Sequence, residues 1–222
     1  MSRSQQGEMA LRPRRILFFA ESVTLAHVAR PLALARGLAA PAYEPIIACD
    51  LRYRQFLQRE PWPFVPLHSI SSERFLQSLA KGSPVYDANV LRSYVAEDLK
   101  LIHSIKPDLI VGDFRLSLSV SARVAGVPYA TVTNWYWSPY CADGPFPLPV
   151  LPFTRHLPLA LSNHLFRTFA PLVTRLHCRP LNQLRLENGL PLLGADLRLI
   201  YTDADYTVYA DVPTEASTEN LP

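Results

Sequence analysis

The stretch KPDLIVGDFRLSLSVSARVAGVPYATVTN, residues 106–134, decides the fold. Its apolar run 109–111 ends in Gly112 and Asp113, the pattern of a buried strand that reaches a turn. The next segment stops at Gly126, a typical helix end, and a second apolar run covers 127–133. This spacing predicts a strand, a helix and another strand, which together form one βαβ unit.

Asp113 lies where the first of these strands ends. The carboxyl edge of a parallel sheet is the place where α/β domains bind ligands and do chemistry, which makes this acid a candidate functional group. An acid at a strand end is also a common helix cap or turn former. The position of Asp113 alone leaves both readings open.

The rest of the chain supplies further strands and helices. Apolar runs and helical spacing predict strands at 16–20, 43–48, 64–67 and 206–210, and helices at 27–39, 71–79 and 88–105. This order predicts an α/β fold, with a Rossmann-like, open and mostly parallel sheet that carries helices on both faces. We expect a disordered tail at 1–13, a single domain at 14–213 and the start of an interdomain linker at 214–222.

Composition limits the classes of function. The chain has 222 residues, 49% hydrophobic and 18% charged, which is typical of a globular domain with a sizeable core. A net charge of only +3, without an aromatic-and-basic pattern, argues against nucleic acid as a partner. Three widely spaced cysteines suit a reducing cytosol, and no apolar run approaches the length of a membrane span. We therefore expect a cytoplasmic protein.

Several common site motifs are missing. None of the eight glycines forms a GxG pair, so the sequence has no dinucleotide fingerprint and no phosphate-cradling loop. No pair of cysteines or histidines has the spacing of metal ligands. We therefore expect no cofactor and no metal bound by this chain. The absence of GxSxG also makes a hydrolase that uses Asp113 and His27 a weaker alternative.

An aromatic segment follows the βαβ unit. Prolines interrupt residues 134–158 six times, which predicts an irregular loop. Loops of this length are usually binding loops or disordered, and the aromatic side chains favour binding. Those aromatic residues are Trp135, Tyr136, Trp137, Tyr140 and Phe146.

The next segment is basic. Helical spacing predicts two helices at 159–172 and 173–188, and no acidic residue occurs between Gly144 and Leu186, whereas five arginines do. Such a helix pair could face anionic lipid at the inner surface of the membrane, or an acidic ligand. We favour the alternative, a packed helix hairpin whose arginines extend into solvent.

His27 is the candidate partner of Asp113. In a doubly wound sheet the first and fourth strands are neighbours, which would bring the turn after the first strand to the end of the fourth. An imidazole held by a carboxylate is a competent general base near neutral pH. A single histidine at a helix start is more often a surface or capping residue, so spacing alone leaves the pair a hypothesis.

Three segments resemble one family. ESVTLAHVARPLALARGL, residues 21–38, is similar to the segment of family 1 glycosyltransferases with the GT-B fold in which a GHxxPxLxLA-type motif carries the catalytic base. This family includes macrolide and flavonoid glycosyltransferases, many of which use UDP-sugars. PDLIVGDFRLSLSVSARVAGVPY, residues 107–129, resembles the segment whose strand-end Asp partners that base. YADVP, residues 209–213, resembles the last strand of the family's N-terminal domain.

The resemblance implies roles for the candidate residues. His27 would deprotonate an acceptor hydroxyl, Asp113 would orient His27, and the aromatic loop would line a pocket for a small lipophilic hydroxylated acceptor. Two departures concern the first motif. Ala26 stands at the family's Gly, and Arg30 stands at its Pro, with Pro31 one place later.

The family's donor-binding domain, with its HxGxxT-like segment, has no counterpart in the sequence. We therefore expect the acceptor-binding half of an inverting glycosyltransferase, inactive alone, whose nucleotide-sugar donor needs a second domain or a partner chain. The alternatives are one subunit of a split glycosyltransferase and a non-catalytic binding or scaffold protein derived from the same fold. Self-association would be another way to cover a surface left bare.

Overall fold

The structure is a computed structural model that describes residues 12–38, 40–141, 154 and 156–210. Nearly all of the tail expected at 1–13 and all of the linker expected at 214–222 lie outside these residues, so both stay predictions. Phe146 lies outside them as well.

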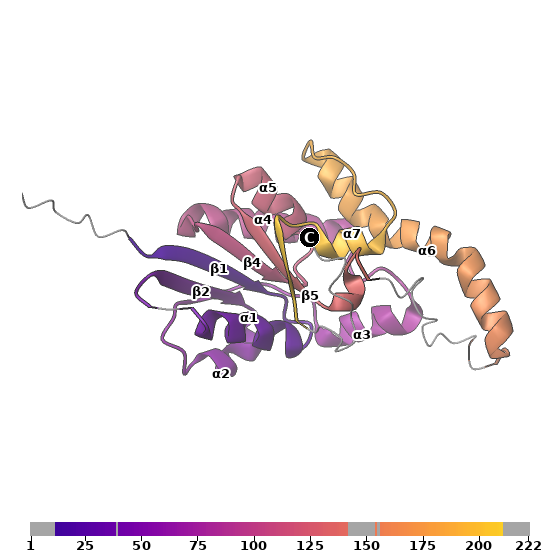
Figure 1. Ribbon diagram of the computed structural model, residues 1–222, viewed down its shortest axis with the longest axis horizontal. Helices are drawn as coiled ribbons and strands as arrows, with labels where there is room; N and C mark the ends of the chain where they lie inside the picture. Colours follow the sequence, from indigo (N-terminus) through magenta and orange to yellow (C-terminus); the bar gives the residue numbers. More distant parts are fainter. Residues whose placement is uncertain (1–11, 39, 142–153, 155, 211–222) are drawn as a thin grey trace, which may run out of the picture.

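Within the described residues six strands form one sheet, in the order β3-β2-β1-β4-β5-β6, and every neighbouring pair is parallel (Figure 1). The α/β fold predicted from the sequence is therefore confirmed. The strands are β1 (Arg14–Ala20), β2 (Tyr43–Cys49), β3 (Phe64–Pro66), β4 (Leu109–Asp113), β5 (Tyr129–Thr133) and β6 (Tyr206–Tyr209).

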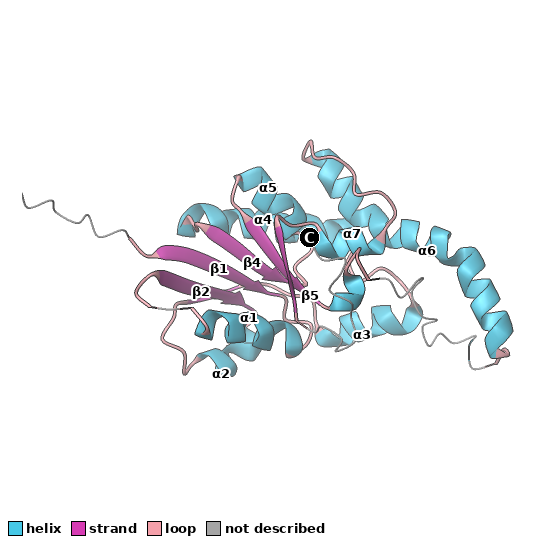
Figure 2. Cartoon of the chain, in the orientation of Figure 1, coloured by secondary structure: helices cyan, strands magenta, loops and turns pink. Residues whose placement is uncertain are grey.

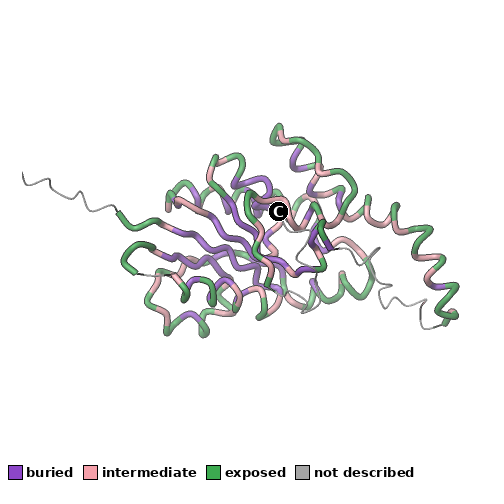
Figure 3. The backbone as a smooth tube through the Cα atoms, in the orientation of Figure 1, coloured by how far each residue is buried: buried purple, intermediate pink, exposed green. Residues whose placement is uncertain are grey.

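Helices cover both faces of the sheet, as predicted (Figure 2). Side chains of β1 alternate between the faces: Ile16 and Phe18 pack with α1 and α2, whereas Leu17 and Phe19 pack with α4 and α5. The central strands β1, β2, β4 and β5 form the buried centre of the molecule (Figure 3). The helices are α1 (Ala26–Arg36), α2 (Arg54–Leu57), α3 (Ser72–Lys81), α4 (Ala88–Ile105), α5 (Leu118–Ala125), α6 (Leu159–Glu187) and α7 (Leu197–Thr202).

Local sequence explains where α4 begins and ends and how the chain then enters β4. The Asp87 side chain accepts a hydrogen bond from the Val90 backbone N–H and caps the start of α4. Lys106, in the left-handed conformation with φ of 54°, ends this helix, and Pro107 follows. The turn at 106–108 then leads into β4, whose last residue is Asp113.

The two helices predicted at 159–172 and 173–188 are wrong as separate elements. The structure has one helix of 29 residues, α6, with Pro171 and Pro180 inside it. A proline removes one backbone hydrogen bond and can bend a helix without ending it. No glycine lies near Pro171 to let the chain reverse direction, and therefore the helix continues.

Candidate active site

The sheet topology brings His27 to Asp113. Ala20 at the end of β1 is in register with Asp113 at the end of β4, and α1 begins six residues later with His27 in its first turn. His27 Nδ1 lies 2.7 Å from Asp113 Oδ1. The Asp113 side chain is fully buried, and the His27 ring is 16% exposed. The contact that the doubly wound order predicts is therefore present in the structure.

Arg30 completes this cluster. Its Nε and Nη2 atoms donate to the two carboxylate oxygens of Asp113, at 2.7 and 2.6 Å. Its Nη1 donates to Asn134 Oδ1 at 2.5 Å. The two-pronged contact fixes the plane of the Asp113 carboxylate. Sequence reasoning noted Arg30 only as a departure from a motif. The i,i+3 spacing from His27, which puts both residues on one face of α1, was the signal for this contact.

The chemistry of His27 depends on which ring nitrogen carries the proton. When Nδ1 is protonated it donates to Asp113, and Nε2 keeps a lone pair that can accept a proton from a hydroxyl group. Arg30 Nη2 also lies 2.7 Å from Nδ1, so it would donate to the ring in the other tautomer. The buried Asp113 carboxylate favours the first arrangement, because only a protonated Nδ1 gives this acid an additional donor. The arrangement suits general-base catalysis.

An aromatic shelf of Phe114, Tyr201 and Trp137 extends from His27. The His27 ring stacks on Phe114 with centroids 4.8 Å apart, and Phe114 stacks on Tyr201 at 5.4 Å. Tyr201, from α7, lies 4.1 Å from Trp137. Phe114 has a φ of 60°, which is rare for a bulky residue and indicates that the structure around it holds it there. Sequence reasoning missed both Phe114 and Tyr201.

A cavity of about 1420 Å³ opens beside this shelf. Pockets for drug-sized ligands typically measure about 300–1,000 Å³, so this cavity accommodates a longer ligand. His27, Arg30 and Asp113 lie at its wall, which is otherwise mostly apolar. The apolar and aromatic lining includes Phe75, Leu79, Val85, Phe114, Leu116, Val132, Tyr136, Trp137, Leu165, Phe166, Phe169, Val173, Leu197 and Tyr201.

The structure separates the aromatic residues of the predicted binding loop. Tyr136 and Trp137 line the cavity. Trp135 is buried, its ring edge-on to Tyr209 at 5.1 Å, and it does not belong to the lining. Tyr140 is exposed and also lies outside the lining. A binding role for each of these residues, and for Phe146, stays a prediction.

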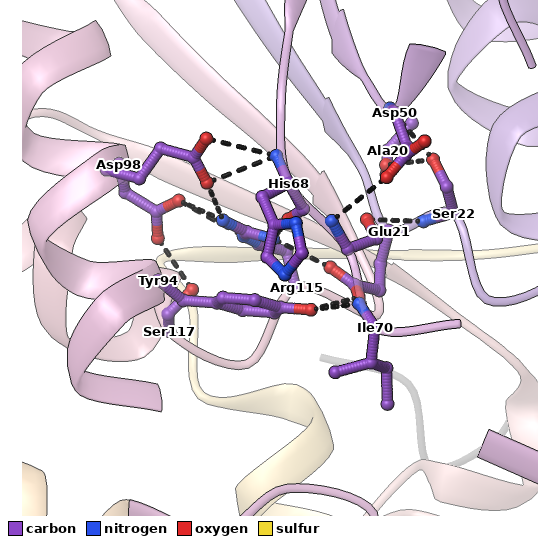
Figure 4. Close-up of polar contacts among 12 residues, drawn as sticks. Ala20, Glu21, Ser22, Asp50, His68, Ile70, Tyr94, Asp98, Arg115 and Ser117 are labelled. Carbon is purple, nitrogen blue, oxygen red and sulfur yellow. Dashed lines mark hydrogen bonds and ion pairs between the residues drawn. The ribbon is translucent and has the colours of Figure 1, made fainter. Parts of the chain in front are cut away.

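A buried ionic network surrounds Arg115, the residue that follows Phe114 in the chain (Figure 4). Arg115, which is fully buried, donates to Glu21 Oε2 and to Asp98 Oδ1, both at 2.9 Å. It also donates to the His68 backbone carbonyl at 2.6 Å, and its guanidinium carbon lies 3.6 Å from the centre of the Tyr94 ring. Three segments that are distant in sequence, the turn after β1, the loop after β3 and helix α4, therefore converge on one side chain.

The charges in this network depend on one another. Burial raises the pKa of the Glu21 and Asp98 carboxyls above the usual range, although Arg115 acts in the opposite direction. Burial by itself lowers the pKa of Arg115, but the attraction of Asp98 and Glu21 outweighs that effect and raises it. Since Asp113, Phe114 and Arg115 are consecutive, the network holds the turn that presents Asp113 and Phe114 to His27.

Gly112, immediately before Asp113, has no room for a side chain. A Cβ atom there would lie 2.4 Å from Leu118 Cδ1 and 3.1 Å from the Tyr129 hydroxyl oxygen, and both of these side chains are buried. Gly112→Ala is therefore expected to lower the free energy of unfolding by about 1–3 kcal/mol, because added atoms strain a packed core. Urea denaturation measures the change.

Gly37→Ala is the matched control for this prediction. A Cβ atom on Gly37 would meet its nearest neighbour at an ordinary 3.4 Å, and Gly37 has a φ of −76°. This change is expected to be neutral or to stabilise the chain by up to about 1 kcal/mol. Equal unfolding midpoints for the two variants would contradict the tight packing described at Gly112.

Two other features are absent from the described residues. No group of three or more His, Cys, Asp or Glu residues among them is arranged to hold a metal ion. None of the helices in this part of the chain is both long enough and apolar enough to cross a bilayer.

Comparison with curated proteins finds mycobacterial relatives, although no family model matches the chain. A protein of Mycobacterium bovis BCG named "Inactive PGL/p-HBAD biosynthesis glycosyltransferase" is 49% identical over 215 residues, which are 97% of this chain and 58% of that protein. A "PGL/p-HBAD biosynthesis glycosyltransferase" of Mycobacterium tuberculosis H37Ra is also 49% identical, over 97% of this chain and 50% of its own length. A "PGL/p-HBAD biosynthesis rhamnosyltransferase" of M. bovis BCG is 50% identical over 96% of this chain and 47% of its length. The chain thus spans about half the length of the curated relatives it matches.

Solved structures show the same fold. The spinosyn forosaminyltransferase SpnP matches with a TM-score of 0.52 and 16% identity, over 90% of this chain and 47% of SpnP. The glycosyltransferase SsfS6 of Streptomyces sp. SF2575 matches with a TM-score of 0.50 and 16% identity, over 90% of this chain and 51% of SsfS6. At this identity the likeness concerns the fold alone.

Proposed function

We propose that this chain belongs to the family 1 glycosyltransferases of GT-B fold and is the acceptor-binding half of an inverting enzyme. This enzyme would transfer a sugar from a nucleotide-sugar to a hydroxyl group of a lipophilic acceptor. The observation that carries the proposal is the contact of His27 with buried Asp113 at the wall of a large apolar cavity.

His27 acts as the general base in the proposed reaction. Its Nε2 takes the proton of the acceptor hydroxyl while the hydroxyl oxygen attacks the anomeric carbon of the sugar, and the nucleoside diphosphate leaves from the opposite face. Asp113 holds Nδ1–H and stabilises the imidazolium that forms. Arg30 holds the Asp113 carboxylate in place through its two-pronged contact.

The acceptor occupies the cavity beside the aromatic shelf. Apolar side chains favour a lipophilic molecule, because its burial removes apolar surface from water. The stacked rings of Phe114 and Tyr201 next to His27 favour an aromatic ring that carries the reactive hydroxyl. We assign Tyr136 and Trp137 to this acceptor site on the basis of their position in the cavity wall.

The donor site is proposed to lie in the half of the relatives that this chain does not match, or in a partner chain. The sequence has no phosphate-cradling glycine motif to hold a nucleotide. The chain alone would then bind acceptor without transferring sugar. Reaction with a nucleotide-sugar fits a cytoplasmic location, which the cysteine pattern also favours.

A non-catalytic binding protein is the second candidate, and two observations favour it. A relative with 49% identity carries the word "inactive" in its name. In addition, Arg30 occupies both oxygens of the Asp113 carboxylate, where the resembling motif has proline. Both candidates bind acceptor in the same cavity, and sugar transfer distinguishes them.

Acceptor binding is tested by isothermal titration of the chain with a long-chain 4-alkylphenol. We expect saturable binding, and the alkylbenzene that lacks the hydroxyl should bind more weakly by about 0.5–1.5 kcal/mol, the contribution of one hydrogen bond. Trp137→Ala should weaken binding about tenfold, because it removes an aromatic contact from the cavity wall.

Tyr140→Ala is the matched control, since Tyr140 belongs to the same aromatic segment and lies outside the cavity lining. The Tyr140→Ala variant should bind the alkylphenol with the same affinity as the unchanged chain. Equal losses in both variants, or no binding of the alkylphenol, would refute the assignment of the cavity as acceptor site.

A further inference from the structure

The N-terminal half of α6 extends away from the sheet and the helices that cover it (Figure 1). The residues that join α6 to the core are Cys178, Leu181 and Leu184, all in its C-terminal half. In the other half, Ser162 is the one buried residue among those described. A helical segment of about 12–15 residues with so little buried surface is only marginally stable in water, so this half of α6 needs a further surface to contact.

Large apolar side chains are exposed along this helix. Leu161, Leu172 and Leu176 are 45%, 55% and 49% exposed. At helical spacing these three residues lie on the same side of α6. Phe169, 54% exposed, borders them and also lines the cavity. The exposed apolar stripe of α6 is therefore continuous with the cavity mouth.

Positive charge flanks the stripe at Arg175 and Arg179, and Arg167 lies farther round α6, where it lines the cavity. Arg167, Arg175 and Arg179 are exposed, and no acidic residue occurs between Gly144 and Leu186. Within the described residues none of these three arginines forms an ion pair, whereas Glu187 at the end of α6 pairs with Arg92 on α4. An amphipathic helix with exposed leucines beside unneutralised arginines has the composition of helices that lie in the interface of an anionic bilayer.

We propose that the exposed face of α6 is a membrane-contact surface for bilayers that contain anionic phospholipid. Leu161, Leu172 and Leu176 enter the boundary between headgroups and acyl chains, and the arginines bind lipid phosphates. A second copy of this chain fits this face less well, because a two-fold contact would bring arginine against arginine. An anionic bilayer, by contrast, neutralises the charge of the arginines and also covers the apolar stripe.

The membrane contact also indicates the class of acceptor substrate, an inference that rests on the proposed function. Since Arg167 and Phe169 line the cavity, a bilayer on α6 lies at the cavity mouth. An acceptor with long alkyl chains then reaches His27 from the bilayer without crossing water. The substrate class would be a membrane-resident hydroxylated lipid.

Vesicle flotation tests the surface, with vesicles of phosphatidylcholine alone and vesicles in which part of it is replaced by phosphatidylglycerol. The chain should float with the anionic vesicles and remain unbound with the neutral ones. Added salt should release it, since salt screens attraction between charges at a surface. The triple variant Arg167→Gln, Arg175→Gln, Arg179→Gln should bind at least about tenfold more weakly, because it removes three cations that attract anionic lipid.

The control variant carries Arg54→Gln, Arg59→Gln and Lys100→Gln, which remove the same charge from exposed positions outside α6. It should bind as the unchanged chain does. A variant with Leu172→Gln and Leu176→Gln should lose binding at unchanged charge, and circular dichroism checks that each variant is folded. Equal losses in the two triple variants would overturn the proposal, as would equal binding to both kinds of vesicle.

Sedimentation velocity tests the alternative occupant of this face, a second copy of the chain. A chain that fails to bind vesicles and forms dimers that the α6 variants dissociate would show that a second copy covers this face, and would overturn the proposal. Vesicle binding requires neither acceptor nor donor. Its failure is therefore distinct from a failure of the cavity to bind alkylphenol, which is the test of the proposed function.

Discussion

His27→Ala is expected to lower the rate of sugar transfer by about 10²–10⁴-fold, the usual contribution of a positioned general base. The measurement uses the proposed assembled enzyme, in which this chain would act together with a donor-binding half, a nucleotide-sugar and a lipophilic acceptor. Among the described residues, His27 and Arg30 are the side chains that contact the Asp113 carboxylate, and only His27 can take a proton from a hydroxyl, because Arg30 stays protonated.

Asp113→Asn should cause a loss of similar size. The amide keeps the shape of the carboxylate, but it no longer stabilises the imidazolium and no longer selects the tautomer with a free Nε2. Acceptor affinity should change little in either variant, because binding comes mainly from the apolar cavity. The loss therefore should appear in kcat and not in KM.

His103→Ala is the matched control, since His103 is exposed on α4 and makes no part of the cavity wall. It should leave transfer unchanged. If His27→Ala keeps full activity, His27 is not the base. If the unchanged chain binds acceptor but the assembled protein transfers no sugar, the non-catalytic candidate is correct.

Arg115→Met is expected to lower the free energy of unfolding by about 3–5 kcal/mol, because removal of one partner leaves buried charges unpaired. Glu21 and Asp98 are fully buried, and in the variant both would lose their common cation. The His68 carbonyl would also lose a donor. Urea denaturation followed by circular dichroism measures the effect. Arg115→Lys keeps the charge but not the planar guanidinium group, so its free energy of unfolding should lie between those of the unchanged chain and Arg115→Met.

Arg92→Met provides the comparison for this buried cation. Arg92 pairs with Glu187 on the surface, where both side chains are more than one third exposed. Exposed ion pairs contribute little, so this variant should unfold at nearly the same urea concentration as the unchanged chain. Similar midpoints for Arg115→Met and Arg92→Met would show that the buried network does not hold the turn at Asp113.

The sequence contains the information for the sheet because its strands are short, strongly apolar and bounded by turn residues. The run 109–111 with Gly112 behind it has few alternatives to a buried parallel strand. The same logic predicted that the first and fourth strands are neighbours, and the structure confirms this: β1 pairs with β4, and Ala20 lies opposite Asp113. The contact of His27 with Asp113 follows from this topology, whereas their catalytic roles remain proposals.

Local patterns do not reveal the other members of the site. Arg30 could be paired with Asp113 only after the sheet order placed α1 over the end of β4. Tyr201 comes from a short helix near the end of the chain, and its stacking on Phe114 depends on how α7 packs. Trp135 and Trp137 are the same residue type two positions apart, yet Trp135 is buried against Tyr209 and Trp137 lines the cavity.

The amino-acid sequence alone predicts the α/β sheet, the placement of Asp113 at its carboxyl edge and the acid-free, arginine-rich character of 145–185. These features depend on spacing and composition along the chain. Only the tertiary structure decided that Arg30 holds Asp113, that Arg115 is buried between two acids, and that α6 continues through Pro171 with an exposed face. The physical reason is that burial and ion pairing depend on which segments meet in space, and segments more than eighty residues apart meet at this site.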